Sequence, residues 1–415
     1  MLFPSARQNL RLFARLDWLA LLLQFVLLVI GVFFIYGIGQ KAGGDLAVKW
    51  SRQIMWILVG GGVYAAATLV DYRTLGKFSW AFYLLALVGL AIVMPLGTVL
   101  NASRSWLNIP GLGMLQPSEP GKAATLLFAA WSLSHPLLKH SKIPLPILAA
   151  VILAPPLLLI LVQPDFGTAL VYLPFCLALL FVNGLRWRWI GYSLAAAVIL
   201  MPMAYSALKP HQQGRINVFL KTPANFLYLA ASPLLSESRR EAWQQHQNDF
   251  FRDTETKGGG DWNAKQSLLA VGSGGFHGKG YMQGTQHILG YLPRTVAPTD
   301  FIFSVIAEEF GFVGAAGIIA LLAMIIILAC RTAIVADNDF GASIAVGGAA
   351  ILATHTFINV GMNFQAAPII GIPLPFVSYG GSFMVTIMAI AGLIQNIHMR
   401  RGTPDRHHHH AHPTA

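Results

Sequence analysis

The chain has 415 residues, of which 55% are hydrophobic and only 11% are charged. Soluble globular domains carry charges on about a quarter of their residues, so this composition excludes an ordinary soluble protein and indicates one that crosses a membrane many times. The formal net charge of +11 does not indicate nucleic-acid binding, because no basic run is interleaved with aromatic residues and membrane proteins collect basic residues beside their spans.

Apolar runs of about 17–25 residues, the length that crosses the hydrocarbon core of a bilayer, recur along the chain. They predict an all-α polytopic membrane protein with ten transmembrane helices. The expected spans lie at residues 18–38, 54–70, 78–97, 121–135, 143–162, 168–185, 189–207, 301–330, 340–362 and 377–397. The first run is too long for a signal-peptide core, so it is interpreted as an uncleaved span. Residues 1–415 then form a single membrane domain, in which residues 208–299 are a large loop between helices 7 and 8.

An even number of spans places both termini on the same side of the membrane, and Lys and Arg indicate which side. The connections on the side of the termini hold twelve of these residues: Arg7, Arg11, Arg15, Arg73, Lys77, Lys139, Lys142, Arg186, Arg188, Arg331, Arg400 and Arg401. The short connections on the other side hold Lys41, Lys49, Arg52 and Arg104. Basic residues concentrate on the cytoplasmic side, so the sequence predicts cytoplasmic termini, a disordered cytoplasmic tail at 402–415, and an extracytoplasmic loop at 208–299.

The first outer connection, NASRSWLNIPGLGMLQPSEPGK, carries Arg104, Glu119 and Lys122. Ser118 can cap the helix that follows, and Glu119 suits the positive N-terminal end of that helix. Capping therefore explains these two residues as well as a functional role does. Lys122 falls just inside the apolar run, where a charged side chain is costly, so its position favours function.

Two further outer segments each carry one candidate. In VQPDFGTALV, Asp165 stands at a sharp turn, where an N-cap and a functional role are equally good interpretations. In HQQGRINVFL, Arg215 begins the long loop and by itself is an ordinary interfacial arginine.

The glycine-rich segment WNAKQSLLAVGSGGFHGKGYMQGTQ invites comparison with a phosphate-binding loop. The pattern G-x-x-x-x-G-K-[ST] fails, because Ser273 replaces the first glycine and Gly280 follows Lys279. Glycines still permit close approach of the backbone to a phosphate, so Lys279 is a weak candidate for contact with a lipid pyrophosphate.

The segment NFQAAPIIGIPLPFVSYGGS places prolines, glycines, Ser378 and Tyr379 at the mouth of the last span. Irregular backbone at membrane depth is tolerated only where it lines a cavity or is buried in protein. A re-entrant turn beside a cavity is therefore expected here.

Three carboxylates lie in PRTVAPTDFIFSVIAEEFGFVG, at the start of the long eighth span. If a helix begins at Thr299 or Asp300, then Asp300, Ser304 and Glu308 share one face. Asp300 can remain ionised at the water boundary, whereas Glu308 needs a partner or a cavity. A polar cavity open to the outer side would account for both residues and for Glu309.

The motifs QPSEPGK, QPDFGT, QSLLAVGSGGFHGKGYMQGTQ, TDFIFSVIAEEFGFVG and GIPLPFVSYGGS occur in this order. Together they closely resemble the SEDS family (shape, elongation, division and sporulation), over nearly the whole chain, and two of them are closer to its rod-shape branch than to its division branch. The sequence departs from the family at Arg294, where a glutamate is usual, and at residues 222–258, which match no motif.

The resemblance implies a peptidoglycan glycosyltransferase that polymerises lipid II on the outer face of the bacterial cytoplasmic membrane, together with a class B penicillin-binding protein. It places the essential aspartate at Asp300, acting as a general base or as the ligand of a divalent cation, Mg²⁺ or Mn²⁺. The expected substrate-binding residues are Arg104, Glu119, Lys122, Asp165, Arg215, Lys279, Glu308, Ser378 and Tyr379.

Two other functions are compatible with a polytopic bundle that contains carboxylates. A lipid II flippase would need a polar route to both faces, but the unusual residues gather on one face, which favours the enzyme. A non-catalytic scaffold for the penicillin-binding protein would leave Glu308 without an explanation.

Overall fold

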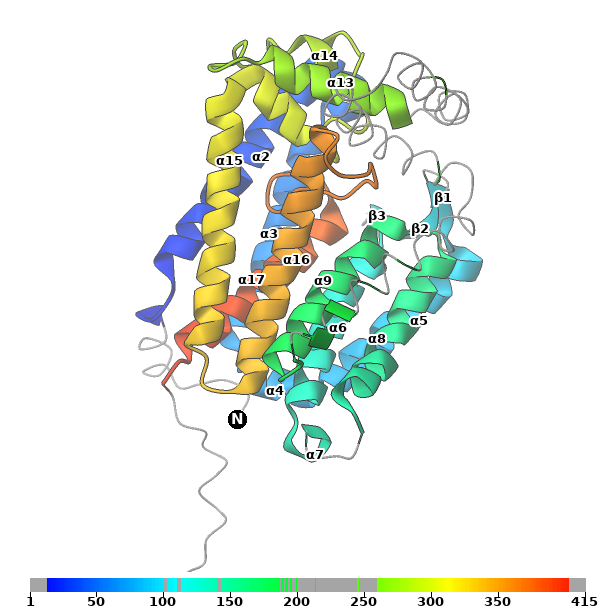
Figure 1. Ribbon diagram of the computed structural model, residues 1–415. Coiled ribbons are helices and arrows are strands. Elements are labelled where there is room, and N and C mark those ends of the chain that lie inside the picture. The colour runs from blue at the N-terminus through cyan, green and yellow to red at the C-terminus, as the bar shows by residue number, and fades with distance from the viewer. Residues whose placement is uncertain are drawn as a thin grey trace, which may run out of the picture.

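The computed structural model describes residues 13–100, 103–109, 113–139, 143–186 and 260–402, with a few single positions between 188 and 245. Within this part of the chain, long helices are joined by short connections and one small sheet (Figure 1). The elements are α2 (Trp18–Ala42), η1 (Gly44–Leu46), α3 (Lys49–Leu69), α4 (Tyr72–Lys77), α5 (Ser79–Leu96), β1 (Thr98–Leu100), β2 (Ser103–Ile109), β3 (Gly113–Leu115), α6 (Ser118–Ser134), α7 (Pro136–Lys139), α8 (Leu145–Val162), α9 (Phe166–Val182), α13 (Gly260–Ser273), α14 (Thr285–Ile288), α15 (Ile302–Ile334), α16 (Asp339–Asn363) and α17 (Gly381–Met399).

Nine of the ten predicted spans coincide with a helix in the described residues. Six of these helices are long and apolar enough to cross a membrane by length and composition: α2, α5, α8, α15, α16 and α17. The shorter α9 is also apolar, while α3 and α6 lie outside that group. Most of the predicted span 189–207 and most of 208–259 lie outside the described residues. The structure therefore supports a multi-pass membrane protein and leaves the count of ten as a prediction.

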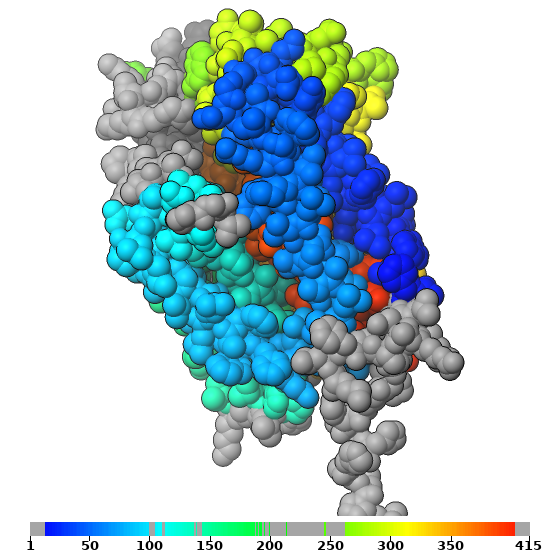
Figure 2. Space-filling view, turned by 180° about the vertical axis from the view of Figure 1, so that it is seen from behind, coloured from blue at the N-terminus to red at the C-terminus, as the bar shows by residue number. Residues whose placement is uncertain are grey.

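The helices form two groups that lie side by side, with α2, α3, α15, α16 and α17 in one and α5, α6, α8 and α9 in the other (Figure 1). Helix α17 packs against α3, and α16 packs against both α15 and α9, so α16 joins the two groups. Seen from behind, orange and red atoms from the C-terminal part of the chain are visible beside α3 (Figure 2). The contact between these groups forms a continuous apolar core.

Side-chain caps fix where two of the helices begin. Asp17 accepts a hydrogen bond of 3.1 Å from the backbone N–H of Ala20 at the start of α2. Asn338 accepts one of 2.8 Å from the N–H of Gly341 at the start of α16. These bonds satisfy backbone donors that have no partner within the helix. Both helices begin at the lower end of the molecule in Figure 1, opposite α13 and α14.

A three-stranded antiparallel sheet, with strand order β1-β2-β3, lies on the right in Figure 1, at the upper end of the group formed by α5, α6, α8 and α9. Thr98 pairs with Trp106, and Leu107 pairs with Leu115. The all-α prediction did not include this sheet. Two of its strands have three residues each, and so short a strand gives no recognisable alternation of polar and apolar residues.

Helix α15 begins at Ile302, close to the predicted span start at 301 but after Thr299 and Asp300, and it breaks at Gly311, where φ is +64°. The loop that follows α13 supplies hydrogen bonds at this break. The N–H groups of Lys279 and Gly280 donate to the carbonyl oxygens of Glu308 and Glu309, at 3.0 and 2.9 Å. The expectation that Asp300 and Glu308 share one face of a helix starting at 299 or 300 is therefore wrong, because Asp300 precedes the helix.

Candidate active site

Three of the outer segments identified in the sequence meet at the upper end of the molecule. The amide of Gln116 donates a 2.7 Å hydrogen bond to Oδ2 of Asp165, and the backbone N–H of Gln116 donates to Oγ of Ser382 at 3.2 Å. A Cβ atom on Gly167 would lie 2.8 Å from the carbonyl oxygen of Ile370. The segments 116–122, 163–168 and 370–382 therefore form one polar assembly, although up to 266 residues of chain separate the bonded groups.

Asp300 belongs to this assembly. Its side chain is half-buried, just before α15, and a Cβ on Gly371 would lie 3.4 Å from its Oδ2 atom. Gly371 has φ of +72°, a conformation that favours glycine. The side-chain amide of Asn359 on α16 donates to the carbonyl oxygens of both Asp300 and Ile372, at 2.9 and 2.7 Å. The backbone that carries the carboxylate is thus fixed to the turn opposite it.

The turn at 374–379 holds the same segment from the other side. The Ser378 hydroxyl donates to the carbonyl oxygen of Thr299 at 2.6 Å and accepts from the N–H of Leu374 at 2.8 Å. The N–H of Tyr379 donates to the carbonyl oxygen of Pro298 at 2.9 Å. Ser378 has no exposed surface, so these contacts give this predicted substrate-binding residue a structural role. The segment is non-helical, as expected.

Two cations that the sequence indicated only as markers of membrane orientation lie at this site. The half-buried Lys49, the first residue of α3, has its Nζ atom 5.1 Å from the centre of the Tyr379 ring. Burial, and then the Arg52 charge, lower the pKa of Lys49, which lies outside the span predicted at 54–70, while Asp300 acts in the opposite direction. Arg52, three residues further along α3, is the cation that acts on Lys49 in this way. Asp300 therefore has a cationic neighbour, which a pattern within one segment cannot show.

Lys122 lies in a buried polar cluster formed by α6 and α16. Its Nζ atom is 2.9 Å from Oε1 of Glu119 and 2.9 Å from Nε2 of His355. Nδ1 of His355 lies 3.2 Å from the carbonyl oxygen of Pro373. The exposed fractions of Lys122, Glu119 and His355 are 0%, 4% and 1%. Lys122 thus has no surface in this structure with which to contact a pyrophosphate, and its role in substrate binding stays a prediction.

Asp165 is the N-cap of α9, one of the two roles left open by the sequence. Its Oδ1 accepts from the N–H of Thr168 at 3.2 Å, and its Oδ2 accepts from the hydroxyls of Thr168 and Ser118 at 2.9 and 3.2 Å. Ser118 itself does not cap α6, since Pro117 precedes that helix and Ser118 is its first residue. The carboxylate of Asp165 joins the starts of two helices.

Glu308 does not line an open polar cavity. Its side chain has no exposed surface, and its Oε1 atom forms an ion pair of 2.6 Å with Nζ of Lys279. The same oxygen accepts hydrogen bonds of 2.7 and 3.1 Å from the N–H groups of Thr285 and Gln286. Lys279 also donates to the Thr285 hydroxyl at 2.8 Å. Glu308 and Lys279, both predicted to bind substrate, therefore bind each other and fix the start of α14.

The glycine-rich segment packs against the break in α15. A Cβ on Gly274 would lie 2.0 Å from the carbonyl oxygen of Ala307, and one on Gly278 would lie 2.1 Å from that of Glu309. Distances this short exclude any side chain without a shift of the backbone. Glu309 is buried beside His287, with Oε1 3.4 Å from Nε2. The glycines thus allow the segment after α13 to pack directly against the backbone of α15.

The two remaining predicted substrate-binding residues are Arg104 and Arg215. Arg104 is exposed on β2 and donates to the carbonyl oxygen of Met94 at 3.2 Å. Arg215 lies outside the described residues.

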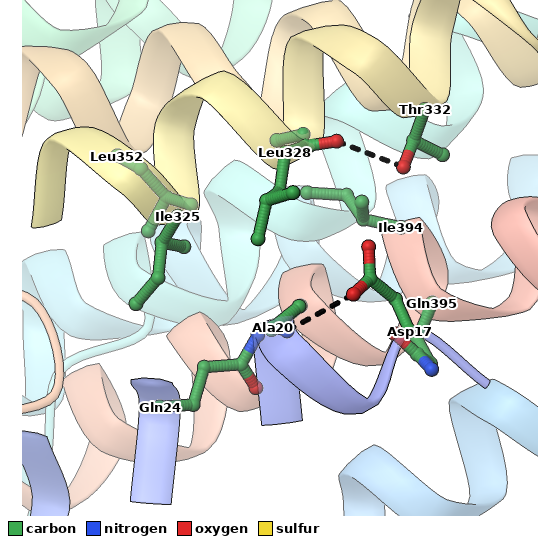
Figure 3. Close-up of a pocket in the computed structure, with 11 residues that line it drawn as sticks. Asp17, Ala20, Gln24, Ile325, Leu328, Thr332, Leu352, Ile394 and Gln395 are labelled. Carbon is green, nitrogen blue, oxygen red and sulfur yellow. Dashed lines mark hydrogen bonds between the residues drawn. The ribbon is translucent and has the colours of Figure 1, made fainter. Parts of the chain in front are cut away.

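A small cavity is present at the lower end of the molecule, remote from this assembly (Figure 3). It is lined by apolar side chains of α15 and α17 together with Asp17, Gln24, Thr332 and Gln395. Because it contains none of the outer segments, it is not part of the candidate active site.

A divalent cation would have few protein ligands at Asp300. No group of three or more His, Cys, Asp or Glu side chains able to hold a metal ion occurs among the described residues. Mg²⁺ is commonly held by one or two carboxylates together with substrate phosphates and water. The single carboxylate of Asp300 fits that mode and does not fit an all-protein metal cage.

Comparison with known proteins gives consistent matches over nearly the whole chain. A family model for FtsW, RodA and SpoVE, described as cell cycle protein, matches residues 17–403. Peptidoglycan glycosyltransferase MrdB from Escherichia coli is 31% identical over 390 residues, covering 93% of this chain and 94% of the relative.

Two solved structures share the fold. A structure described as "Structural coordination of polymerization and crosslinking by a peptidoglycan synthase complex" matches with a TM-score of 0.68 and 24% identity, covering 94% of this chain and 99% of the other. The Thermus thermophilus rod shape determining protein RodA matches with a TM-score of 0.61 and 24% identity, covering 94% and 98%.

Proposed function

The chain belongs to the FtsW/RodA/SpoVE family, and we propose that it is a peptidoglycan glycosyltransferase that polymerises lipid II. The MrdB relative carries that enzyme name and is similar along 94% of its own length. The observation in this chain that supports the proposal is the half-buried carboxylate of Asp300, whose backbone is held by Asn359 and which faces Gly371. The Lys49 side chain interacts electrostatically with this carboxylate. Since MrdB is named as a glycosyltransferase and not as a transporter, the flippase alternative is not favoured.

The proposed reaction is an inverting glycosyl transfer. A hydroxyl oxygen of the acceptor sugar bonds to the anomeric carbon of the donor, and the bond from that carbon to the lipid diphosphate breaks. The hydroxyl proton passes to a base, and the diphosphate leaves with the electron pair. Asp300 is the proposed base, because its carboxylate is an acceptor on a backbone held by Asn359.

Cationic groups stabilise the diphosphate as its negative charge develops. Lys49 and Arg52 are the proposed groups among the described residues, since Lys122 and Lys279 are already paired with Glu119 and Glu308. Arg215 is retained as a proposed contact from the sequence. If Mg²⁺ or Mn²⁺ takes part, Asp300 would hold it, and the cation would supply charge stabilisation at the diphosphate.

The location and partner are also proposals. The outer segments lie toward the end that holds α13 and α14, and α4 lies at the other end (Figure 1). Helix α4 carries Arg73 and Lys77, while Arg186 and Arg400 follow the C-terminal ends of α9 and α17. The proposed orientation therefore keeps both termini in the cytoplasm and the reaction outside. The synthase complex named above couples polymerisation to crosslinking, so a class B penicillin-binding protein is the proposed partner, and the likeness to RodA supports a role in elongation.

Polymerisation of purified lipid II tests the function directly. The chain in detergent, with its transpeptidase partner present, should produce glycan chains visible on a gel, and an added chelator reports whether a divalent cation is needed. A detergent micelle has no two compartments, so a flippase would be silent in this assay. Absence of polymer, together with Asp300-dependent movement of labelled lipid II across liposomes, would overturn the proposal.

A further inference from the structure

We infer that His355 is a positioning residue that couples the buried Lys122 to the turn against which Asp300 lies. The inference rests on the proposed function, since it assigns Asp300 to the reaction. His355 stands in the middle of α16, which the sequence predicts only as an apolar span, and none of the outer motifs includes it. Its contacts join α6 to the 370–382 segment.

The hydrogen bonds of His355 define which ring nitrogen carries the proton. The Pro373 carbonyl oxygen can only accept, so Nδ1 of His355, 3.2 Å away, must be the donor. In the neutral ring the other nitrogen, Nε2, is then an acceptor, and it lies 2.9 Å from Nζ of Lys122. The Lys122 ammonium therefore donates both to His355 and to Oε1 of Glu119. One imidazole links a buried cation to a specific backbone carbonyl.

That carbonyl lies next to groups that contact Asp300. The preceding residue, Ile372, has its carbonyl oxygen bound by Asn359, whose amide also binds the carbonyl oxygen of Asp300. One residue earlier, Gly371 lies against the Asp300 carboxylate. His355 and Asn359 are four residues apart on α16 and so lie on the same face of the helix. The helix thereby holds residues 371–373 at two adjacent carbonyls.

This arrangement gives Lys122 a role that needs no exposed surface. Lys122 holds His355, His355 holds Pro373, and the turn at 371–373 forms one wall beside the carboxylate of Asp300. A displacement of about 1 Å in a catalytic group can lower a rate roughly 100-fold. Loss of the His355 contact should therefore reduce the chemical step, while contacts with the lipid-linked substrate remain.

The experiment uses His355→Gln in the full-length chain with its partner. A glutamine can reach the position of Nε2 and accept from Lys122, but it does not place a donor at the position of Nδ1, so the Pro373 contact is lost. His355→Ala serves as a second variant, although loss of an acceptor for buried Lys122 threatens its folding. Thr354→Ala is the matched control, because Thr354 donates only within α16, to the Ala350 carbonyl at 2.7 Å.

Two readouts are needed. In the first, hydrogen exchange in detergent should become faster in residues 371–376 of His355→Gln, with residues 279–288 unchanged. In the second, kcat for lipid II polymerisation should fall at least roughly tenfold with KM unchanged. Thr354→Ala should match wild type in both.

The exchange measurement does not depend on catalysis, so it tests the positioning even if the wild-type chain fails to polymerise lipid II. Unchanged exchange in residues 371–376 of His355→Gln would overturn the inference. A rise in KM with normal kcat would also overturn it, because that result would indicate direct contact with substrate.

Discussion

The side-chain amide of Asn359 donates a hydrogen bond of 2.9 Å to the main-chain carbonyl oxygen of Asp300. Asp300 precedes α15, so helical hydrogen bonds alone do not fix its backbone. The bond from α16 supplies a fixed point, and the contacts of Ser378 and Tyr379 with residues 298–299 supply two more. The main chain that carries the partly exposed Asp300 carboxylate is thereby held by the fully buried side-chain amide of Asn359. This relationship explains how a half-exposed residue can have a defined position.

Asp300→Asn should lower polymerisation by roughly 10²–10⁴-fold, the usual contribution of a general base. Folding should be unaffected, because the residue is half-buried and its backbone contacts remain. The measurement is glycan product from labelled lipid II, together with the thermal unfolding midpoint in detergent. Asp45→Asn is the control, since Asp45 is an exposed acid in η1, outside the candidate active site. Near-normal polymer from Asp300→Asn would remove the base assignment.

Lys122→Met should destabilise the protein by about 3–5 kcal/mol, because it leaves the Glu119 carboxylate buried without its cation. Adding Glu119→Gln to the same chain should recover part of that loss, since the buried charge is then removed. Unfolding midpoints of the single and double variants check this. If Lys122→Met unfolds like wild type and only its KM for lipid II rises, the residue contacts substrate instead.

Glu308→Gln should loosen the start of α14, because the buried carboxylate that accepts from Lys279, Thr285 and Gln286 loses its charge. The expected cost is about 1–3 kcal/mol. Hydrogen exchange should accelerate in residues 279–288 and remain unchanged in residues 371–376, which serve as the internal control. An effect confined to lipid II binding, with normal exchange, would contradict the structural role.

Gly278→Ala should destabilise by more than about 1 kcal/mol, because its φ is +82° and a Cβ would lie 2.1 Å from the carbonyl oxygen of Glu309. Gly272→Ala is the matched control in the same segment, since a Cβ there meets nothing within 4 Å. Gly272 lies within α13, so alanine should leave stability unchanged or raise it slightly. Comparison of the two unfolding midpoints is sufficient, and equal midpoints would show that the close contact with α15 is absent.

Single cysteines placed at exposed positions test the proposed orientation. Asp45→Cys and Arg294→Cys should react with a membrane-impermeant thiol reagent from outside the cell, whereas Lys77→Cys and Arg186→Cys should react only after the cytoplasm is opened. The two native cysteines, Cys176 and Cys330, are first replaced by serine. Reversed labelling at Arg294→Cys would place the candidate active site in the cytoplasm.

Much of the architecture could be predicted from the sequence, because it depends on local properties. An apolar run of sufficient length must satisfy its own backbone in lipid and therefore becomes a helix, and nine predicted spans are helices in the described residues. The cap at Asp165 needs only the N–H of Thr168, three residues away. The polar outer segments could likewise be identified without knowledge of their contacts, because charged groups beside lipid are costly.

The partners of those polar groups could not be predicted in the same way. Lys122 and His355 are 233 residues apart in the chain, and Asn359 lies 59 residues from Asp300. Histidine and asparagine in an apolar run have no pattern that assigns them to a particular carbonyl or cation. The break at Gly311 was not predicted either, since a glycine within an apolar helix is ordinary in membrane proteins.

The amino-acid sequence alone is sufficient to predict a membrane protein, the positions of most of its helices and its family resemblance. It also identifies the polar segments that contain the candidate site residues. The three-dimensional packing adds that Lys122 is buried against His355, that Glu308 and Lys279 form an ion pair, and that Lys49 lies over the ring of Tyr379. The two kinds of information differ because the interactions behind them differ in range. The length of an apolar run and the capping of a helix are properties of one continuous segment. An ion pair or hydrogen bond between helices depends instead on how segments distant in the chain pack together.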